Sequence, residues 1–167
     1  MQASSSSSVD FSASTGEGGF LLRISGVELK LFIYKCVKKR GDLDEELAAR
    51  KLSPDKPATI LPASMLKTPL QLFQAAAHYV IYREELSRFK NKGLLLLLLA
   101  TGHTQINELI ADLRRHYAVS NDYFVISLGD EGFDKTGCVG FKDYDLSLDE
   151  ESYNILAKNV SSLLSLL

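Results

Sequence analysis

The stretch GLLLLLLATGHTQINELI, from Gly93 to Ile110, holds six consecutive leucines followed at once by an amphipathic pattern. A helix that crosses a bilayer needs about 20 apolar residues, so this run is too short for one. Seven apolar residues between two glycines are typical of a strand buried on both faces, although leucine itself slightly prefers helix. We therefore predict that residues 94–100 form the central strand of the core.

The overall composition indicates one globular domain. The chain has 167 residues, of which 46% are hydrophobic and 24% charged, with a net charge of −2. A protein that coats nucleic acid non-specifically is usually strongly basic, so any such contact here must come from a local patch. Residues 121–167 hold three Lys against nine Asp or Glu, a balance of −6 that leaves +4 for residues 1–120. This asymmetry permits a basic face on the first part of the chain, and solvated helix faces are the alternative.

The N-terminal segment and the cysteines bear on location. Residues 1–19 are rich in Ser and Gly without Lys or Arg, which predicts a disordered tail and neither a secretory signal nor a transit peptide. The folded domain is then expected over residues 20–167. Cys36 and Cys138 are too few for a disulfide framework or a zinc site, and Cys36 lies in an apolar run that favours a buried thiol. A reducing compartment, cytoplasmic and nuclear, is the expectation.

Alternation of apolar and polar residues predicts further strands. VELKLFIYKCV (Val27–Val37) alternates as a half-buried strand does, and residues 20–24 offer a hairpin partner through the turn Ser25-Gly26. Residues 123–128, YFVISL, form another predicted strand. A helix between this strand and the leucine strand allows the two to pair in parallel by a right-handed crossover.

Capping signals predict the helices. Asp42 with Glu45 has the spacing of a capping box for a helix over residues 43–51, and Ser147 with Glu150 has the same spacing before the last helix. Thr68 as N-cap, with Pro and Gln following, starts a helix over residues 69–86 that is apolar on nearly every side. Its second face either docks a partner or packs on a sheet. The fold class is α+β (mixed α/β): a single domain with a small mixed β-sheet packed with helices.

The sequence shows little catalytic chemistry. The turn from Thr101 to Thr104, between the predicted strand and helix, resembles a place where a phosphate sits at a helix N-terminus, but it lacks the glycine spacing of known phosphate loops. Thr104 acting as a plain N-cap is the simpler reading. His78, His103 and His116 lack metal-ligand spacing, and no nucleophile stands in a recognisable elbow. We therefore expect no enzyme activity, no catalytic residues, no cofactor and no metal.

Two basic clusters remain as candidate binding residues. Lys38, Lys39 and Arg40 close the first long strand, and Arg88, Lys90 and Lys92 precede the leucine run. Together they can hold a few phosphates with a shallow salt dependence, whereas either cluster alone is a solvated turn.

Several segments in succession resemble a known family. They are VKKRGDL (37–43), TPLQLFQAAAHYV (68–80), RFKNKGL (88–94) before the hydrophobic run, an Ile five residues after Thr101, SNDYFVISL (120–128), and an acidic-capped last helix. Their order and spacing, from about Phe20 to the C-terminus, are similar to those of the small non-catalytic subunit of the KEOPS (EKC) complex, the PRPK-binding protein (TPRKB) family. The chain lacks a Glu early in the leucine run and a Lys near His78 that the family often carries.

The resemblance implies a binding subunit of the complex that makes threonylcarbamoyladenosine in tRNA. Such a subunit docks on the small kinase/ATPase subunit, stimulates it, reaches the other KEOPS subunits through it, and helps recruit tRNA by its single-stranded acceptor end. On this basis Lys38, Lys39, Arg40, Lys90 and Lys92 are predicted to contact tRNA. The predicted kinase interface is the second face of the helix at 69–86 and the last helix, through Leu72, Tyr79, Leu163, Leu164 and Leu167.

Two other function classes remain open. One is a small-molecule or nucleotide-binding enzyme that uses the strand-turn-helix at Thr101 and Thr104, which predicts thermal stabilisation by a ligand. The other is a scaffold that binds only protein.

Overall fold

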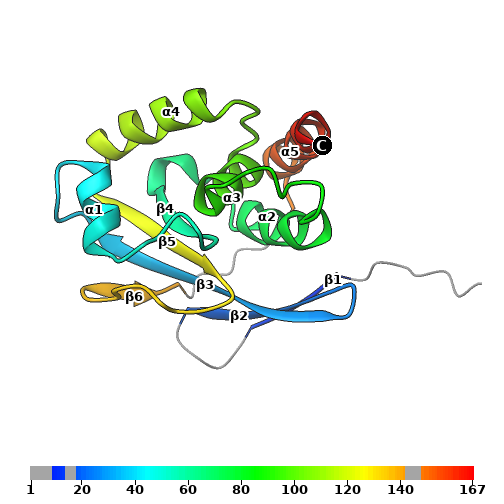
Figure 1. Cartoon of the computed structure of the whole chain (residues 1–167), viewed down its shortest axis with the longest axis horizontal. Helices are drawn as coiled ribbons and strands as arrows, with labels where there is room; N and C mark the ends of the chain where they lie inside the picture. The colour runs from blue at the N-terminus through cyan, green and yellow to red at the C-terminus, as the bar shows by residue number, and fades with distance from the viewer. Residues whose placement is uncertain (1–8, 14–17, 142–147) are drawn as a thin grey trace, which may run out of the picture.

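Helices gather on one side of an antiparallel sheet in the computed structural model (Figure 1). The structure describes residues 9–13, 18–141 and 148–167. The elements in chain order are β1 (Val9–Ala13), β2 (Gly19–Ile24), β3 (Val27–Val37), α1 (Leu43–Ala49), β4 (Ala58–Pro62), the 3₁₀ turn η1 (Ala63–Met65), α2 (Leu70–Ile81), α3 (Lys92–Thr101), α4 (Ile106–Val119), β5 (Asp122–Leu128), β6 (Cys138–Gly140) and α5 (Glu150–Leu166). The predicted α+β domain is confirmed.

The predicted hairpin at the start of the domain is confirmed. Strands β2 and β3 pair antiparallel, and the turn residues Ser25 and Gly26 have φ angles of 49° and 80°. Positive φ at both central residues is the geometry of a type I′ turn, whose twist matches that of the strands it joins. The hairpin therefore fixes the register of β3, the strand on which the rest of the sheet is built.

The sheet has the order β1-β2-β3-β5-β4, with β6 paired to β3, and every pairing is antiparallel. The predicted parallel crossover onto β5 is therefore wrong. Its assumed partner, the leucine run, is not a strand, and β5 instead lies between β3 and β4. β1 lies within the segment for which we predicted disorder, so that prediction fails for residues 9–13. The tail at residues 1–8 and 14–17 lies outside the described residues.

The leucine run forms helix α3, which corrects the central prediction. The Asn91 side chain accepts a hydrogen bond from the Leu94 N–H at 3.0 Å and caps the start, while Gly102 at φ 75° closes the end in the left-handed conformation. Gly93 lets the first turn of α3 pack closely against β4, because a Cβ there would lie 2.8 Å from the Ala58 carbonyl oxygen. A helix apolar on all sides shows no periodicity, so its sequence pattern matches that of a buried strand.

Helix α2 begins one residue later than predicted, at Leu70 with Pro69 as its N-cap, and it ends earlier than expected. The Thr68 Oγ1 accepts from the Leu70 N–H at 3.3 Å, and the Gln71 Oε1 accepts from the Thr68 N–H at 3.0 Å, as in a reciprocal capping box. The helix ends at Ile81, where turns replace the predicted continuation to residue 86.

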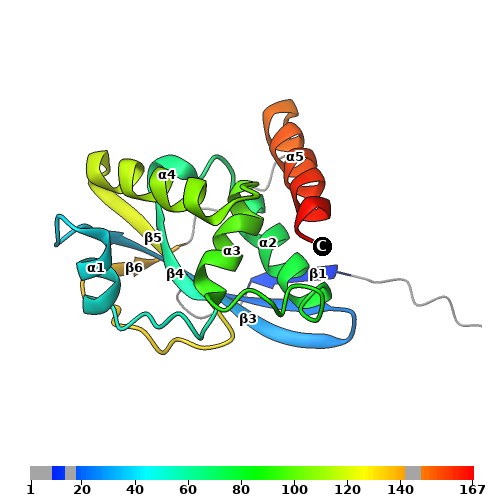
Figure 2. The same ribbon diagram turned by 45° about the horizontal axis from the view of Figure 1, so that its top comes forward.

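The last two helices also depart from their predicted starts. Gln105, not Thr104, precedes α4, and no side chain caps it. For α5 the cap is Asp149, whose Oδ1 accepts from the Ser152 N–H at 2.7 Å. The predicted capping role of Ser147 lies outside the described residues. Figure 2 shows α5 at the outside of the helical layer, with the C-terminus at its end.

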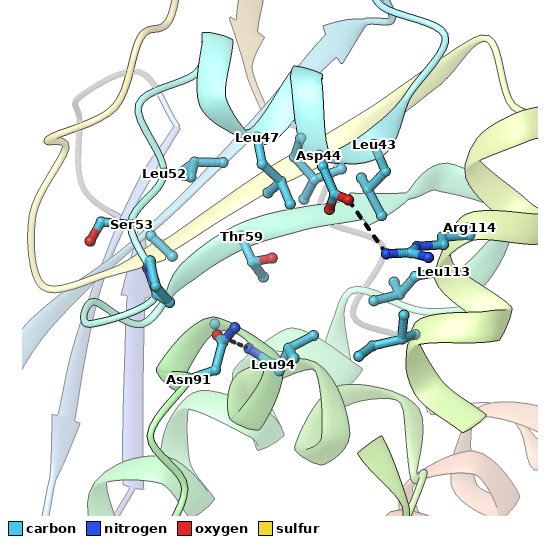
Figure 3. A pocket seen from close by; sticks show the side chains of 15 residues that line it. Leu43, Asp44, Leu47, Leu52, Ser53, Thr59, Asn91, Leu94, Leu113 and Arg114 are labelled. Atoms are coloured by element: carbon cyan, nitrogen blue, oxygen red, sulfur yellow. Dashed lines mark hydrogen bonds and ion pairs between the residues drawn. The ribbon is translucent and has the colours of Figure 1, made fainter. Parts of the chain in front are cut away.

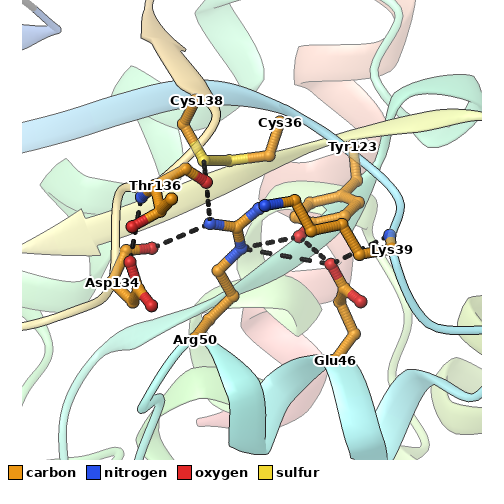
Figure 4. The surroundings of a disulfide bond; sticks show 8 residues. All are labelled: Cys36, Lys39, Glu46, Arg50, Tyr123, Asp134, Thr136 and Cys138. Carbon is orange, nitrogen blue, oxygen red and sulfur yellow. Dashed lines mark hydrogen bonds and ion pairs between the residues drawn. A yellow bond between two sulfur atoms is a disulfide. The ribbon is translucent and has the colours of Figure 1, made fainter.

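The two cysteines form a disulfide, so the predicted buried thiol at Cys36 is wrong. Cys36 and Cys138 are direct partners in the pairing of β3 with β6 (Figure 4). A sequence separation of 102 residues hides this contact from any local pattern. The expectation of a reducing compartment therefore has no support from the cysteines.

A buried polar network lies next to the disulfide. The Arg50 guanidinium donates to the Thr136 carbonyl at 2.6 Å and to the Tyr123 hydroxyl at 2.9 Å, and this hydroxyl donates to the Glu46 carboxylate. Burial, with Glu46 nearby, raises the pKa of Tyr123 to about 12. Charged side chains such as Glu46 and Arg50 are seldom buried unless they are paired. Their network holds the loop before β6 against α1 (Figure 4).

No single helix among the described residues is both long and apolar enough to cross a membrane. Helices α3 and α4 would qualify together by length and composition alone, but they bend by 82° where they join.

Candidate functional site

The first basic cluster is only partly available for binding. The Lys38 Nζ donates to the Tyr117 carbonyl at 2.8 Å and to the Ala118 carbonyl at 3.3 Å, so its charge lies at the C-terminal end of α4. A cation is favourable there because it neutralises the negative end of the helix. Lys39 and Arg40 are exposed, and the Glu46 carboxylate holds the Arg40 backbone N–H at 2.8 Å. The structure thus leaves two exposed cations in this cluster and gives Lys38 a structural role.

The second basic cluster lies at the start of α3. Lys90 and Lys92 are exposed, and the Lys92 N–H donates to the Pro54 carbonyl at 2.8 Å. Strand β4 separates the two clusters: its last residue pairs with the start of β5 near Lys38, and its first residue contacts Gly93. Five residues at about 3.3 Å each give a separation of roughly 15 Å. The clusters are therefore neighbours but do not form one continuous patch.

A cavity of about 280 Å³ lies between the clusters, and its walls come from α1, β4, the start of α3 and α4 (Figure 3). Its walls are mainly apolar, and its polar members include Thr59 and Asn91. Arg114 on α4 and Asp44 on α1 bridge its mouth, 3.4 Å apart, and both side chains are exposed. Such an exposed pair is weak, so it does not seal the opening.

The predicted kinase-contact residues divide between core and surface. Leu72 and Leu163 are only 1% and 3% exposed, so they pack inside the chain's own core and are corrected to core residues. Tyr79 is half-buried on α2, and burial raises the pKa of its hydroxyl. Leu164 and Leu167 on α5 are exposed, at 68% and 44%. Periodicity could not separate Leu163 from Leu164, because adjacent helical residues point about 100° apart and the apolar pattern of α5 fits either residue on the core side.

The exposed leucines belong to a larger feature that we did not predict. Tyr153, Val160 and Leu164 on α5, with Leu167 directly after its last residue, are all exposed large apolar residues, and we call them the apolar stripe of α5. Their spacings of seven, four and three residues keep them on one side of the helix. The same helix buries Leu163 and Leu166 on another side, so the stripe is not needed for the fold.

The turn between α3 and α4 places His103 between Thr101 and Asp112, a contact that the sequence did not predict. Since α3 is a helix, the predicted strand-turn-helix at Thr101 and Thr104 is wrong, and Thr104 is simply exposed. Thr101 Oγ1 lies 2.7 Å from His103 Nδ1, and His103 Nε2 lies 2.6 Å from Asp112 Oδ2. Asp112 was missed because it is one of two acids on the polar face of α4, and no local signal marks it.

No protein-family model matches the chain, and neither the curated proteins nor the solved structures gave a match. Within the described part of the chain, no group of three or more His, Cys, Asp or Glu side chains is placed to hold a metal ion. The fold and its surface define an α+β domain with an exposed apolar helix, two small basic clusters and an apolar cavity.

Proposed function

We propose that this protein is the small non-catalytic subunit of a KEOPS/EKC complex, which takes part in threonylcarbamoyladenosine modification of tRNA. In this role it binds and stimulates the kinase/ATPase subunit and helps recruit tRNA by its acceptor end. The observation that carries the proposal is the apolar stripe of α5, because it is a surface that the fold itself does not use.

The stripe has the character of a protein-binding surface. Tyr153 and Leu164 are 60% and 68% exposed, which is costly for large apolar side chains unless a partner covers them. Residues spaced by three and four along a helix repeat every 3.5 residues on average, the period with which helices pack side by side. A helix-containing partner surface, as on a kinase lobe, suits this stripe.

The neighbourhood of the cavity supports the tRNA part of the proposal. Exposed cations lie at both ends of β4, and the apolar cavity opens between them. Proteins hold single-stranded nucleic acid by combining basic side chains along the backbone with apolar or aromatic surfaces for the unstacked bases. The weakly closed mouth at Arg114 and Asp44 leaves the cavity accessible to such a base.

The first test is complex formation with the cognate kinase/ATPase subunit, measured by size-exclusion chromatography with light scattering. We expect a 1:1 complex for the native chain and its loss in Leu164→Asp. Ser165→Asp is the matched control, since it adds the same charge at the next, exposed position off the stripe. Both variants should keep the native thermal transition. Separate elution of the native chain at micromolar concentration would overturn the proposal.

The second test addresses tRNA. Reversing Lys90 and Lys92 to Glu should weaken tRNA binding to the complex and reduce the salt slope by about 1.4 for two lost contacts to a single strand. Lys30→Glu, at an exposed lysine on β3, should leave the slope unchanged. If the native complex binds no tRNA, the protein is a scaffold for protein partners only. If Lys90 and Lys92 can be reversed without effect, they are not part of the site.

A further inference from the structure

Besides the apolar cavity, the structure has a polar hollow at the C-terminal end of α3. It has a volume of about 270 Å³, and its walls come from η1 and the loop after it, the α3–α4 turn, α4 and α5. The residues that matter below are Ser64, Lys67, Thr101, His103, His116 and Lys158. Nothing in the proposed kinase or tRNA contacts uses them.

We infer that this hollow is a binding site for the phosphate group of a small phosphate ester. The inference does not depend on the proposed KEOPS role, because it rests on a different set of residues. Cationic and hydroxyl side chains converge there from separate segments of the chain. Both lysines also line a neighbouring hollow that contains Asp149, Glu150 and Glu151, but among the described residues no carboxylate forms an ion pair with either of them.

The two lysines supply fixed positive charge. Lys67 precedes α2 and Lys158 lies on α5, and both are exposed at the rim of the hollow. Within the part of the chain that the structure describes, neither forms an ion pair with a carboxylate. Two lysines from distant segments that face one hollow repel each other weakly, and an anion between them relieves that repulsion.

His103 lines the hollow with both of its ring nitrogens in hydrogen-bond contact with neighbouring side chains. The Thr101 Oγ1 donates to the Leu97 carbonyl at 2.7 Å and lies equally close to His103 Nδ1. A hydroxyl has one proton, so while it bonds to Leu97 it must accept from His103 Nδ1–H. His103 Nε2 lies 2.6 Å from Asp112 Oδ2, so both ring nitrogens are engaged within the protein and the ring forms part of the wall of the hollow.

The acid at the hollow does not oppose an anion. The His103 hydrogen bond, followed by the charge of Arg115, holds the pKa of Asp112 below its usual value. Its two oxygens are each engaged, Oδ2 with His103 at 2.6 Å and Oδ1 with Arg115 at 2.6 Å. The single negative charge of Asp112 is thus balanced by its own partners, and the lysines remain available for a ligand.

His116 and Ser64 complete the donor set from another direction. The Ser64 Oγ lies 2.8 Å from His116 Nδ1 and 3.2 Å from the Ser120 Oγ. Donors spread over several elements suit a tetrahedral oxyanion, whereas a carboxylate is most often held by the flat fork of an arginine. Arg115, the guanidinium at this place, is already bound to Asp112. The volume is below that of most pockets for drug-sized molecules, which favours a small ester.

The test uses the three histidines as internal reporters. We expect saturable shifts of the His103 and His116 ring nitrogens when inorganic phosphate is added at constant ionic strength, followed by long-range ¹H–¹⁵N NMR. His78, on α2 beside Tyr82 and outside the hollow, should not move. Equal shifts at all three rings, or no saturable shift at millimolar phosphate, would overturn the site.

Variants then tie the binding to the lysines. Lys67→Ala and Lys158→Ala should each raise the Kd for phosphate by about tenfold, the scale of one charge-assisted hydrogen bond. Both side chains are exposed, so the fold should persist, and Lys30→Ala serves as the matched control. An unchanged Kd in both lysine variants would refute the inference. Glycerol 3-phosphate should bind at least as tightly as phosphate, and its failure to compete would rule out esters.

Discussion

Helices α3 and α5 are both rich in leucine, but the fold uses them in opposite ways. From Leu95 to Leu99, α3 exposes at most 4% of any side chain, whereas α5 buries Leu163 and leaves the next residue, Leu164, 68% exposed. Helix α3 contacts α2, β4, α4 and α5, so it has neighbours on every side. Helix α5 contacts α2 and α3 and lies at the margin of the helical layer (Figure 2).

The difference shows that leucine content does not distinguish a core helix from a binding helix. What distinguishes them is the number of sides that neighbouring elements cover. Like most surface helices, α5 buries one side, with Leu163 and Leu166, against the core. The apolar stripe lies on a different side, where polar residues are usual. The stripe is therefore a candidate for function, and the leucines of α3 are explained by stability alone.

The largest expected effect is in α3. Leu97→Ala removes a fully buried side chain, so we expect the free energy of unfolding in urea to fall by about 2–5 kcal/mol. Leu97→Met conserves volume and should cost less than about 1.5 kcal/mol. If the alanine variant lost no more than the methionine variant, α3 would be loosely packed and the contrast with α5 would fail.

The second prediction compares adjacent residues of α5. Leu163→Ala should lower the free energy of unfolding by about 2–5 kcal/mol, because Leu163 is 3% exposed. Leu164→Ala should change it by less than about 0.5 kcal/mol, as surface substitutions do. Chemical denaturation of the isolated protein measures both. Equal losses would mean that the stripe is covered by the chain itself, and the proposed docking surface would be lost.

Local signals predicted one part of the fold and failed for another. The strand over Val27–Val37, the Ser25-Gly26 turn and the capping side chain of Asp42 depend on signals over a few residues, and each was confirmed. The alternation predicted for that strand is only partly present, because Leu31–Tyr34 are buried on both faces of the sheet. The leucine run carries no such signal, since both a buried strand and an enclosed helix are apolar throughout. There the outcome depended on Asn91 and Gly102, whose capping roles we did not consider.

The candidate sites depended still more on distant contacts. Cys36 meets Cys138 only because β6 pairs with β3, and Lys158 shares a hollow with Lys67 only because α5 packs beside the start of α2. The basic clusters could be predicted as charges, but the contact of Lys38 with the end of α4 could not. The exposure of Leu164 and the burial of Leu163 likewise follow from packing of whole elements.

A third prediction concerns the contact between the two helices. Gly102 has φ 75°, and a Cβ built there would lie 2.5 Å from Asn159 Oδ1 on α5. Gly102→Ala should therefore destabilise the protein by more than the roughly 1–2 kcal/mol of left-handed backbone strain alone. Gly26→Ala is the matched control, because φ is 80° there and nothing lies within 4 Å. Equal losses of unfolding free energy would show that Asn159 yields without cost.

The smallest expected effects are at the N-caps of the two helices. Asn91→Ala and Asp149→Ala each remove a side chain that accepts from a first-turn N–H, at 3.0 Å and 2.7 Å. Asn91→Ala should lower the global free energy of unfolding by about 1 kcal/mol, since α3 unfolds only with the core around it. Asp149→Ala should cost less globally, because the first turn of a marginal helix can fray on its own.

Native-state hydrogen exchange separates these two outcomes. Amides in the first turn of α5 should exchange faster in Asp149→Ala while those of α3 stay protected, and in Asn91→Ala protection should fall throughout the core. Ser161→Ala, at an exposed position of α5, controls for an unspecific effect of substitution in that helix. If Asp149→Ala lowered protection in α3 as well, the two helices would unfold as one unit. The contrast between an enclosed helix and a marginal one would then hold for exposure but not for stability.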